Sequence, residues 1–343
     1  MTAQSQIDAL NDALFKTIGD NHTGQAVTQW IDTGNPELNR IISGRYDGGL
    51  PFGRMIEVFG EPSTGKTADA TEWMVRAQQM GGCAIFIDWE RSFDVGLAEG
   101  FGLTTERPYW IYAKPKTWEE GNTLAAKACQ LIRASKAIPD DAPILVVYDS
   151  IAAAMPKSVN EKGIDEYTMN DTTALARVTS TTLKAMAQYA EDFNATFVYL
   201  NQMRLKPGVM FGDPRTTPGG KAMEFYASAR LALGRQKIMD KGETGDKEFV
   251  GQNISVQCVK TKFTRPFQEC NLRMMYNELD VAYFDHVAST LDLLIKRGWV
   301  EYNKPRVTWT DGKKYFVKDL VAKLNAEPNG MEQLKALLPK SNK

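Results

Sequence analysis

Histidine, paired cysteine and long apolar runs are scarce in this chain of 343 residues. The two histidines, His22 and His286, stand far apart, so we expect no histidine-based metal site or nucleophile. The four cysteines form no C-x-x-C pair, and we predict buried free thiols, which suit a reducing cytosol. No apolar run approaches the ~20 residues that span a bilayer, and the N-terminus lacks a signal-peptide profile. We therefore expect a cytoplasmic protein without membrane contacts.

An excess of charge of either sign is also missing. Lys and Arg number 41 and Asp and Glu 42, which gives a formal net charge of −1. No global field therefore attracts nucleic acid, and any such contact must come from local clusters of basic residues. Hydrophobic residues make up 43% and charged residues 24%, as in an ordinary globular protein with one large core and a smaller appendage.

The pattern along the chain divides it into three regions. Residues 1–32 contain a linker and a helix with a one-sided apolar stripe that includes Ile7, Leu10 and Leu14. This helix packs either on its own domain or on a neighbouring protomer. Residues 33–277 alternate strands with helices, which predicts an α/β fold with a mostly parallel central sheet. Residues 278–343 read as a small α+β domain.

The expected elements follow from the periodicity. Strands are predicted at 55–59, 83–88, 143–149, 195–201, 229–233, 254–260 and 268–276, and the last of them include antiparallel pairs. Helices between the strands are predicted at 68–80, 119–135 and 171–192. In the last region, helices are predicted at 284–297, 317–326 and 330–338, with a strand-like turn at 298–302.

Residues 60–67 fit the phosphate-binding pattern G-x-x-x-x-G-K-[ST] in full and lie between a predicted strand and a predicted helix. Glycines let backbone N–H groups turn toward an anion, Lys66 would reach the β- and γ-phosphates, and Thr67 would bind Mg²⁺. The alternative is a structural glycine-rich turn. The expected nucleotide contacts are Gly60, Glu61, Pro62, Ser63, Thr64, Gly65, Lys66, Thr67 and Ala68.

Polar residues follow three of the predicted strands, where an open α/β sheet binds ligands. Asp149 is the candidate Mg²⁺ ligand, although an Asp there can also cap a turn. Glu90 is the candidate base for the attacking water, or else a surface residue, and Asp94 could meet the nucleotide base. Gln202 could sense the γ-phosphate, although turn chemistry explains the polar Asn201–Gln202 pair equally well.

A long loop at 203–220 contains four glycines and three prolines and shows no helix or strand period. Such connections are usually functional. Its cations Arg204, Lys206 and Arg215 face one acid, and Val209 and Met210 are apolar without an amphipathic partner. Cations for phosphates and apolar wedges for bases suit single-stranded nucleic acid. A substrate lid is the competing interpretation.

Weaker signals come from other basic residues. The mixed charge of a second loop, 155–170, is uninformative, while the helix after it presents Arg177 and Lys184 on one face, either for binding or as a solvated face. Lys260 and Lys262 end a strand, where they could complete an anion site from a neighbouring subunit or merely protect a solvated edge.

Taken in order and spacing, these motifs resemble the bacterial RecA recombinases and their phage relatives. The matching segments are GEPSTGKT, FIDWERSFD, LVVYDSIAA, NQMRLKPGVMFGDPRTTPGGKAMEFYAS and VKTKFTRPF. The similarity runs over about residues 33–267 and is weaker in the last region, where STLDLLIKRGWVEY is also similar. The resemblance implies a RecA-like P-loop ATPase core, with ATP and Mg²⁺ as cofactors, in a DNA-dependent ATPase. It further implies helical filaments on single-stranded DNA, pairing with homologous duplex DNA and strand exchange.

The resemblance also implies residue roles. Glu90 matches the water-activating glutamate, Gln202 the glutamine that couples the γ-phosphate to DNA, and Phe225 an aromatic of the protomer interface. Asp149 matches the Mg²⁺-site aspartate, Lys260 and Lys262 match lysines that reach ATP across that interface, and the N-terminal helix matches one that docks on the adjacent subunit. DNA contacts are expected at Arg177, Lys184, Met203, Arg204, Lys206, Pro207, Gly208, Val209, Met210, Arg215, Gly219, Gly220 and Lys221.

Several positions depart from the family pattern. Pro207 replaces a β-branched or aliphatic wedge, Leu97 replaces an aromatic residue that stacks on adenine, and residues 167–172 are rewritten. The chain ends without an acidic tail. These departures are typical of a divergent member, located in a bacterial cytoplasm or, for a phage protein, in that of the host. A ring-forming helicase of related fold and a non-catalytic coating protein with structural ATP are the alternatives.

Overall fold

The structure is a computed structural model. It describes residues 4–5, 7–9, 12–13, 26–168, 170–205, 208, 214–241 and 246–340, without the side chains of residues 164, 172 and 241. Leu10 and Leu14 of the predicted N-terminal stripe lie outside these residues, as do Lys206, Pro207, Val209 and Met210 of the long loop. The described residues before position 14 are helical, and Ile7 is 51% exposed.

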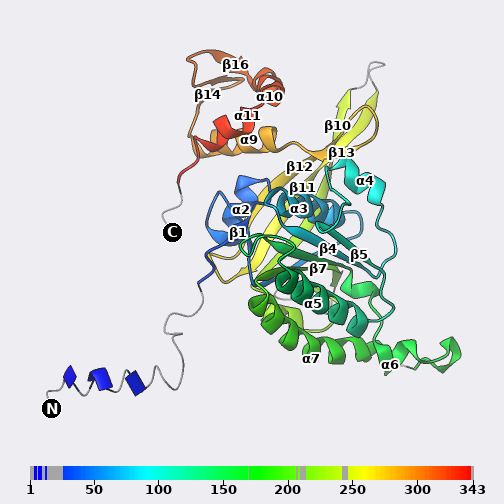
Figure 1. The fold of residues 1–343 in the computed structure, drawn as a ribbon. Coiled ribbons are helices and arrows are strands. Elements are labelled where there is room, and N and C mark those ends of the chain that lie inside the picture. Colours follow the sequence, from blue (N-terminus) through cyan, green and yellow to red (C-terminus); the bar gives the residue numbers. More distant parts are fainter. Residues whose placement is uncertain are drawn as a thin grey trace.

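A nine-stranded mixed sheet forms the centre of the molecule, in the order β13-β12-β11-β10-β3-β7-β6-β4-β5 (Figure 1). Its parallel strands are β3 (Met55–Gly60), β4 (Cys83–Asp88), β5 (Trp110–Ala113), β6 (Ile144–Asp149) and β7 (Ala195–Gln202). β10 (Ala229–Lys241) joins β3 in parallel, and β11 (Lys247–Thr261), β12 (Gln268–Tyr276) and β13 (Ala282–Phe284) follow antiparallel. The predicted α/β class and the antiparallel end are confirmed.

Helices cover both faces of the sheet, which explains the uninterrupted apolar sequences of its central strands. On one face, Ile56 and Val58 of β3 belong to a core that includes α2 (Pro36–Ser43) and α3 (Lys66–Gln79). On the other face, Met55 belongs to a core that includes α5 (Trp118–Ser135) and α7 (Asp171–Asp192). All four cysteines are free and buried, as predicted.

The prediction missed several elements and shortened others. β5 at the sheet edge was not predicted, because a run of four residues is too short to show a period. β10 and β11 extend well beyond the predicted 229–233 and 254–260, since the outer part of their hairpin is exposed and its sequence polar. Also unpredicted were α2, β1 (Trp30–Ile31), β2 (Leu50–Pro51), α4 (Val95–Gly100) and the short 3-10 helix η1 (Ile151–Ala153).

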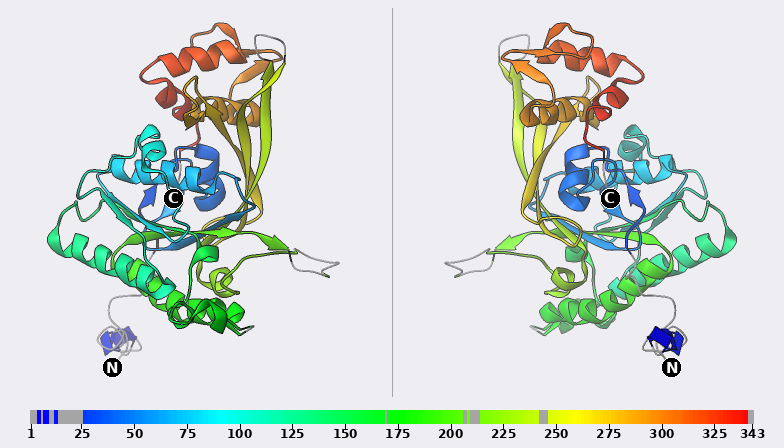
Figure 2. Two further views of the ribbon diagram at one scale, coloured as in Figure 1. Left: turned by 90° about the vertical axis from the view of Figure 1, so that its right-hand side faces the viewer. Right: turned by 90° about the vertical axis from the view of Figure 1, so that its left-hand side faces the viewer.

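The last region has a hydrophobic cluster of its own and lies beyond one edge of the central sheet (Figure 2). The predicted helices are α9 (His286–Arg297), α10 (Val317–Ala326) and α11 (Gly330–Lys335). A three-stranded sheet, β14 (Glu301–Asn303), β15 (Arg306–Thr308) and β16 (Lys314–Phe316), stands where only a strand-like turn was predicted. Three-residue strands are too short to show alternation.

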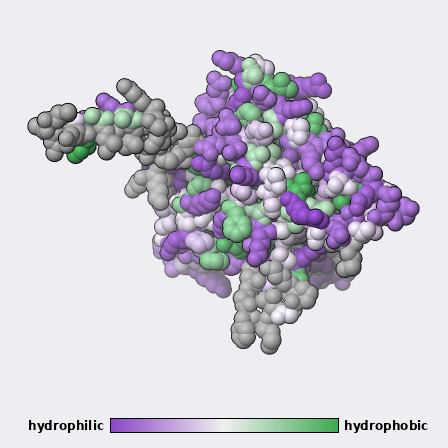
Figure 3. Space-filling model, turned by 90° about the horizontal axis from the view of Figure 1, so that it is seen from below, coloured by the Kyte–Doolittle hydropathy of each residue, from purple (hydrophilic) through white to green (hydrophobic). Residues whose placement is uncertain are grey.

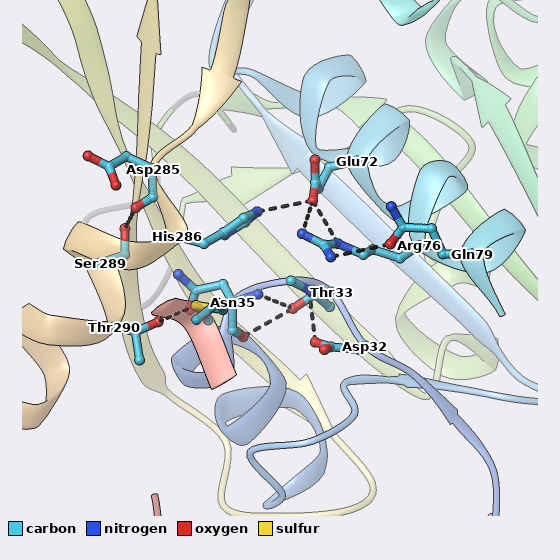
Figure 4. Close-up of polar contacts among 12 residues, drawn as sticks. Asp32, Thr33, Asn35, Glu72, Arg76, Gln79, Asp285, His286, Ser289 and Thr290 are labelled. Carbon is cyan, nitrogen blue, oxygen red and sulfur yellow. Dashed lines mark hydrogen bonds and ion pairs between the residues drawn. The ribbon is translucent and has the colours of Figure 1, made fainter. Parts of the chain in front are cut away.

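Charged side chains join α9 to the helix that follows the phosphate loop (Figure 4). Glu72 of α3 lies 3.0 Å from His286 Nε2 and 2.7 Å from Arg76 Nη2. Arg76 also donates to Gln79. Burial would raise the pKa of Glu72, but the hydrogen bonds and charges of His286 and Arg76 together lower it. A second ion pair, Asp32 with Lys335 at 2.8 Å, links the chain near β1 to α11.

Replacing Glu72 with Gln should lower the free energy of unfolding by about 1–3 kcal/mol, because a part-buried charge-assisted contact is lost. The pKa of Glu72 is lower folded than unfolded, so its stabilisation is present above the unfolded value of about 4.3. It is lost as the pH falls through the folded value. Urea unfolding at pH 7 and in acid tests this, with the exposed Glu106→Gln as control. Equal losses at both pH values would contradict the assignment.

Candidate nucleotide site and DNA-binding loops

The phosphate loop connects β3 to α3 and requires glycine at two positions. A Cβ on Gly60 would lie 2.5 Å from the carbonyl oxygen of Leu233, and one on Gly65 would lie 2.4 Å from Ile254 Cδ1. Gly65 also has a φ of +89° and leaves α3 without a side-chain cap. No side chain caps the first backbone N–H groups of α3, so these groups can donate to an anion.

Lys66 is held over the phosphate loop by carbonyl groups of the loop itself. Its Nζ donates to Glu61 O at 2.9 Å and to Gly60 O at 3.3 Å. Burial lowers the pKa of Lys66, while the charges of Asp149 and Glu90 oppose this shift. Two neutral carbonyls are weak partners for a part-buried ammonium, so a phosphate oxygen would be a better one.

Thr67 and Asp149 meet where the sequence predicted a metal site. The hydroxyl of Thr67 donates to Asp149 Oδ2 at 2.8 Å, and Asp149 is 4% exposed. Burial, followed by the charges of Glu90 and Asp88, raises the pKa of Asp149 to about 7 despite the opposing Thr67 and Lys66. A cation would relieve this repulsion, and hydroxyl and carboxylate oxygens are ligands that Mg²⁺ accepts.

Thr67 and Asp149 fit Mg²⁺ as a small set of protein ligands. Within the described ranges, no group of three or more His, Cys, Asp or Glu side chains is placed to hold a metal ion. Mg²⁺ commonly uses one or two protein ligands and completes its shell with phosphate oxygens and water. The Thr67–Asp149 pair is therefore suited to a Mg²⁺ ion that also binds phosphate oxygens of a nucleotide.

Glu90 lies beside this pair, at the end of β4. Ser150 Oγ donates to Glu90 Oε1 at 2.5 Å, and the backbone N–H of Glu90 donates to Asp149 O at 3.1 Å. Three carboxylates thus gather at the ends of β4 and β6, since Asp88 and Asp149 are register partners and the charges of Asp88 and Glu90 both act on Asp149. The sequence reasoning missed Ser150, although it directly follows Asp149.

Asp88 and Asp94 shape the segment after β4. Asp88 accepts from the N–H of Arg91 at 2.6 Å and from the Tyr112 hydroxyl at 2.8 Å, so it orders the turn that carries Glu90. Asp94 caps α4 by accepting from Leu97 N at 3.0 Å. Leu97, at the position where an adenine-stacking aromatic was expected, is 59% exposed. The predicted contact of Asp94 with a nucleotide base remains a prediction.

The end of β7 joins the phosphate loop to the long loop. Gln202 is the register partner of Gly60, and the N–H of Met203 donates to Gly60 O at 3.0 Å. Asn201 Nδ2 donates to Pro218 O at 3.0 Å, which ties the beginning of the long loop to its end. The same amide donates to Glu57 at 2.9 Å. Sequence reasoning weighed γ-phosphate sensing against turn chemistry for the Asn201–Gln202 pair and missed the hydrogen bonds of Asn201 to Pro218 and Glu57.

Glu57 holds the side-chain amide of Asn201 in place. It is fully buried in β3, yet it accepts from Arg230 Nε at 2.6 Å as well as from Asn201. The guanidinium of Arg230 lies 5.0 Å from the centre of the Phe59 ring. A buried carboxylate with a charged partner and a second donor holds its neighbours in one arrangement.

The long loop is not structureless throughout, which corrects the prediction. β8 (Arg204–Leu205) pairs antiparallel with β9 (Arg215–Thr216) at its base, and Figure 2 shows this pair projecting from the core. Strands of two residues are too short to show the alternation of polar and apolar residues that predicts a strand. Arg204 is exposed, and so is Gly208, whose φ is +76°.

The end of the long loop packs against α7. A Cβ on Gly219 would lie 3.1 Å from Ile151 Cγ2, and one on Gly220 would lie 3.1 Å from Ala176 Cβ. Both glycines have positive φ. Lys221 is exposed and precedes α8 (Ala222–Tyr226).

Helix α7 presents the other two predicted DNA-binding cations. Arg177 and Lys184 are both exposed, and Arg177 Nη2 donates to Asn170 O at 3.1 Å. The 155–170 loop before it contains α6 (Lys157–Asn160) and a 3-10 turn, η2 (Ile164–Glu166). Seen from below, the surface is a mosaic of hydrophilic residues broken by smaller hydrophobic areas (Figure 3).

Lys260 and Phe225 are brought together at the end of β11. Lys260 Nζ donates to the carbonyls of Glu224 at 2.5 Å and Phe225 at 3.0 Å, and Phe225 is 71% exposed. Burial, with the charges of Lys262 and Arg230, lowers the pKa of Lys260. Among the described residues, neither Lys260 nor the exposed Lys262 has a hydrogen bond or ion pair to the phosphate loop of its own chain.

Comparison with known proteins agrees with this geometry. The profile of the RecA N-terminal domain matches residues 6–279. The chain belongs to the RecA family. It is 34% identical over 310 residues to Protein RecA of Streptococcus equi subsp. zooepidemicus (strain MGCS10565), covering 87% of this chain and 78% of that protein.

Two further RecA proteins give the same result. Protein RecA of Streptococcus parasanguinis is 33% identical over 325 residues, covering 91% of this chain and 81% of its own length. Protein RecA of Clostridium tetani (strain Massachusetts / E88) is 34% identical over 282 residues, covering 79% and 74%. As a member of the RecA family, the protein is an ATP-dependent recombinase. Within the described residues, no helix is both long and apolar enough to span a bilayer.

Proposed function

We propose that this protein is a DNA-dependent ATPase that polymerises on single-stranded DNA and exchanges strands with a homologous duplex. The end of β7 carries the proposal. Gln202 lies beside the phosphate loop, and Asn201, just before the long loop, hydrogen-bonds to Pro218 near the end of that loop. A change at a bound γ-phosphate would therefore reach DNA through adjacent residues of one strand. A ring helicase or a coating protein has no comparable support.

At the nucleotide, the proposed roles follow from the contacts. Lys66 would leave the loop carbonyls for the β- and γ-phosphates, and Thr67 with Asp149 would hold Mg²⁺. When bound, the metal supplies positive charge to the phosphate oxygens. Glu90, oriented by Ser150, would position the attacking water and accept its proton.

At the DNA, exposed cations would bind phosphates. Arg177 and Lys184 of α7 lie on the helix against which the long loop ends; Arg204 lies at the start of that loop, and Lys221 directly follows it. We further propose that Lys260 and Lys262 reach the nucleotide of a neighbouring protomer in a helical filament. The exposed ring of Phe225 would lie in the same interface.

The rate of ATP hydrolysis with and without single-stranded DNA tests this function. We expect DNA to stimulate hydrolysis at least tenfold, because ordering the long loop would fix Gln202 beside the γ-phosphate. Duplex DNA of the same sequence is the control substrate. Equal rates with and without DNA would contradict the coupling, and closed hexamers instead of filaments in electron micrographs would favour the helicase.

A further inference from the structure

Strand β11 holds the base of the long loop through a glutamine. Arg215 of β9 donates from Nη2 to Gln257 Oε1 at 2.8 Å, and Gln257 Nε2 donates to Glu269 Oε1 at 2.7 Å. Both ends of the Gln257 amide are thus used, which fixes its orientation between a cation and an anion. Val256 and Cys258, its neighbours in sequence, are buried in the core on the opposite face of the sheet.

The same strand holds the segment that follows the loop. A register shift between Arg230 and Leu231 of β10 leaves Val259 of β11 unpaired, so Lys260 lies opposite Arg230. Lys260 then binds the carbonyls at the end of α8. One strand therefore contacts both Arg215, at the base of the loop, and α8, which the loop enters.

A cavity of about 640 Å³ places this contact near the nucleotide site. Arg215 and Gln257 line it together with Glu61 and Thr64 of the phosphate loop and Met203 at the start of the long loop. Movement of β11 would therefore act on the loop base next to the residues that surround the nucleotide.

We propose that Gln257, oriented by Glu269, is a positioning residue for DNA binding: it seats Arg215 so that β11 fixes the base of the long loop. The inference rests on the proposed function of that loop. It assigns Arg215 to positioning rather than to a direct DNA contact. It also links Lys260 to DNA binding through β11. A phosphate of the nucleotide bound to a neighbouring protomer would compete with the α8 carbonyls for the Lys260 ammonium.

The test is a Gln257→Met variant, which keeps the side-chain length and loses both hydrogen bonds. The measured quantity is the ratio of the dissociation constants for fluorescent oligo(dT) with ADP and with a slowly hydrolysed ATP analogue. We expect this ratio to fall at least about fivefold while the melting temperature is unchanged. Ser255→Ala, two residues away on the same exposed face of β11, should leave the ratio at the wild-type value.

Exchanging the partners separates positioning from direct contact. In the double variant Arg215→Gln with Gln257→Arg, the new arginine can pair with Glu269 and donate to the new glutamine, so the ratio should recover. Recovery no better than in Arg215→Gln alone would overturn the proposal, and so would a Gln257→Met ratio equal to wild type. A wild-type ratio near one would instead contradict the proposed function, and this inference with it.

Discussion

Replacing Lys66 with Ala is expected to reduce ATP hydrolysis by at least ~10²-fold and to abolish ATP-dependent strand exchange. The Lys66 ammonium contacts the carbonyls of the phosphate loop directly, and Arg235 of β10 donates to the Ser63 carbonyl at 3.3 Å. Without the Lys66 ammonium, the γ-phosphate would lose one of the positive charges that offset Asp149 and Glu90. Hydrolysis is measured by phosphate release, and exchange with labelled homologous DNA.

Two variants control this experiment. Lys127→Ala removes an exposed lysine of α5 and should change neither activity. Lys66→Arg retains the charge but not the compact ammonium, and we expect it to recover little hydrolysis. The Lys66→Ala protein should fold normally, since burial of Lys66 opposes its charge in the native state. Strand exchange at full rate in that variant would show that the proposed nucleotide site is wrong.

The sequence predicted the parallel centre of the sheet well because those strands are buried on both faces. Each of β3, β4 and β6 is buried along its whole length, so apolar runs and their polar ends were readable. The phosphate loop, Glu90 and Asp149 were proposed as site residues for the same reason, since parallel strand ends gather at one edge. The structure then brings Thr67 to Asp149 as that topology requires.

Other contacts left no local signal. Asn201 and Glu57 are 144 residues apart, and Arg230 and Glu57 are 173 apart, so nothing in either neighbourhood reveals the pairing. Arg215 was predicted to bind DNA, and its hydrogen bond to Gln257 left no signal beside it because Gln257 lies on a distant strand. Charge and spacing identify which residues can bind an anion, whereas the fold decides which of them are already engaged.

Replacing Glu90 with Gln should separate ATP binding from ATP hydrolysis. Gln keeps an oxygen that can accept from Ser150 and keeps the side-chain volume, but it cannot take a proton from water. We expect hydrolysis to fall by about 10²–10⁴-fold while ATP-dependent binding to single-stranded DNA is retained, because Lys66, Thr67 and Gln202 are unchanged. Filaments should then persist longer in ATP than those of the wild type.

The control must remove the same charge without touching the site. Glu99→Gln does so on the neighbouring α4, where the carboxylate accepts from Thr105 in an exposed position. Hydrolysis and DNA binding should both stay at wild-type levels in this variant. If Glu90→Gln also hydrolysed ATP at the wild-type rate, the carboxylate would be idle, and ATP would act as a structural ligand of a DNA-coating protein. Loss of ATP binding in Glu90→Gln would instead assign Glu90 to nucleotide affinity. A slower hydrolysis reports on proton transfer only when the variant still binds ATP.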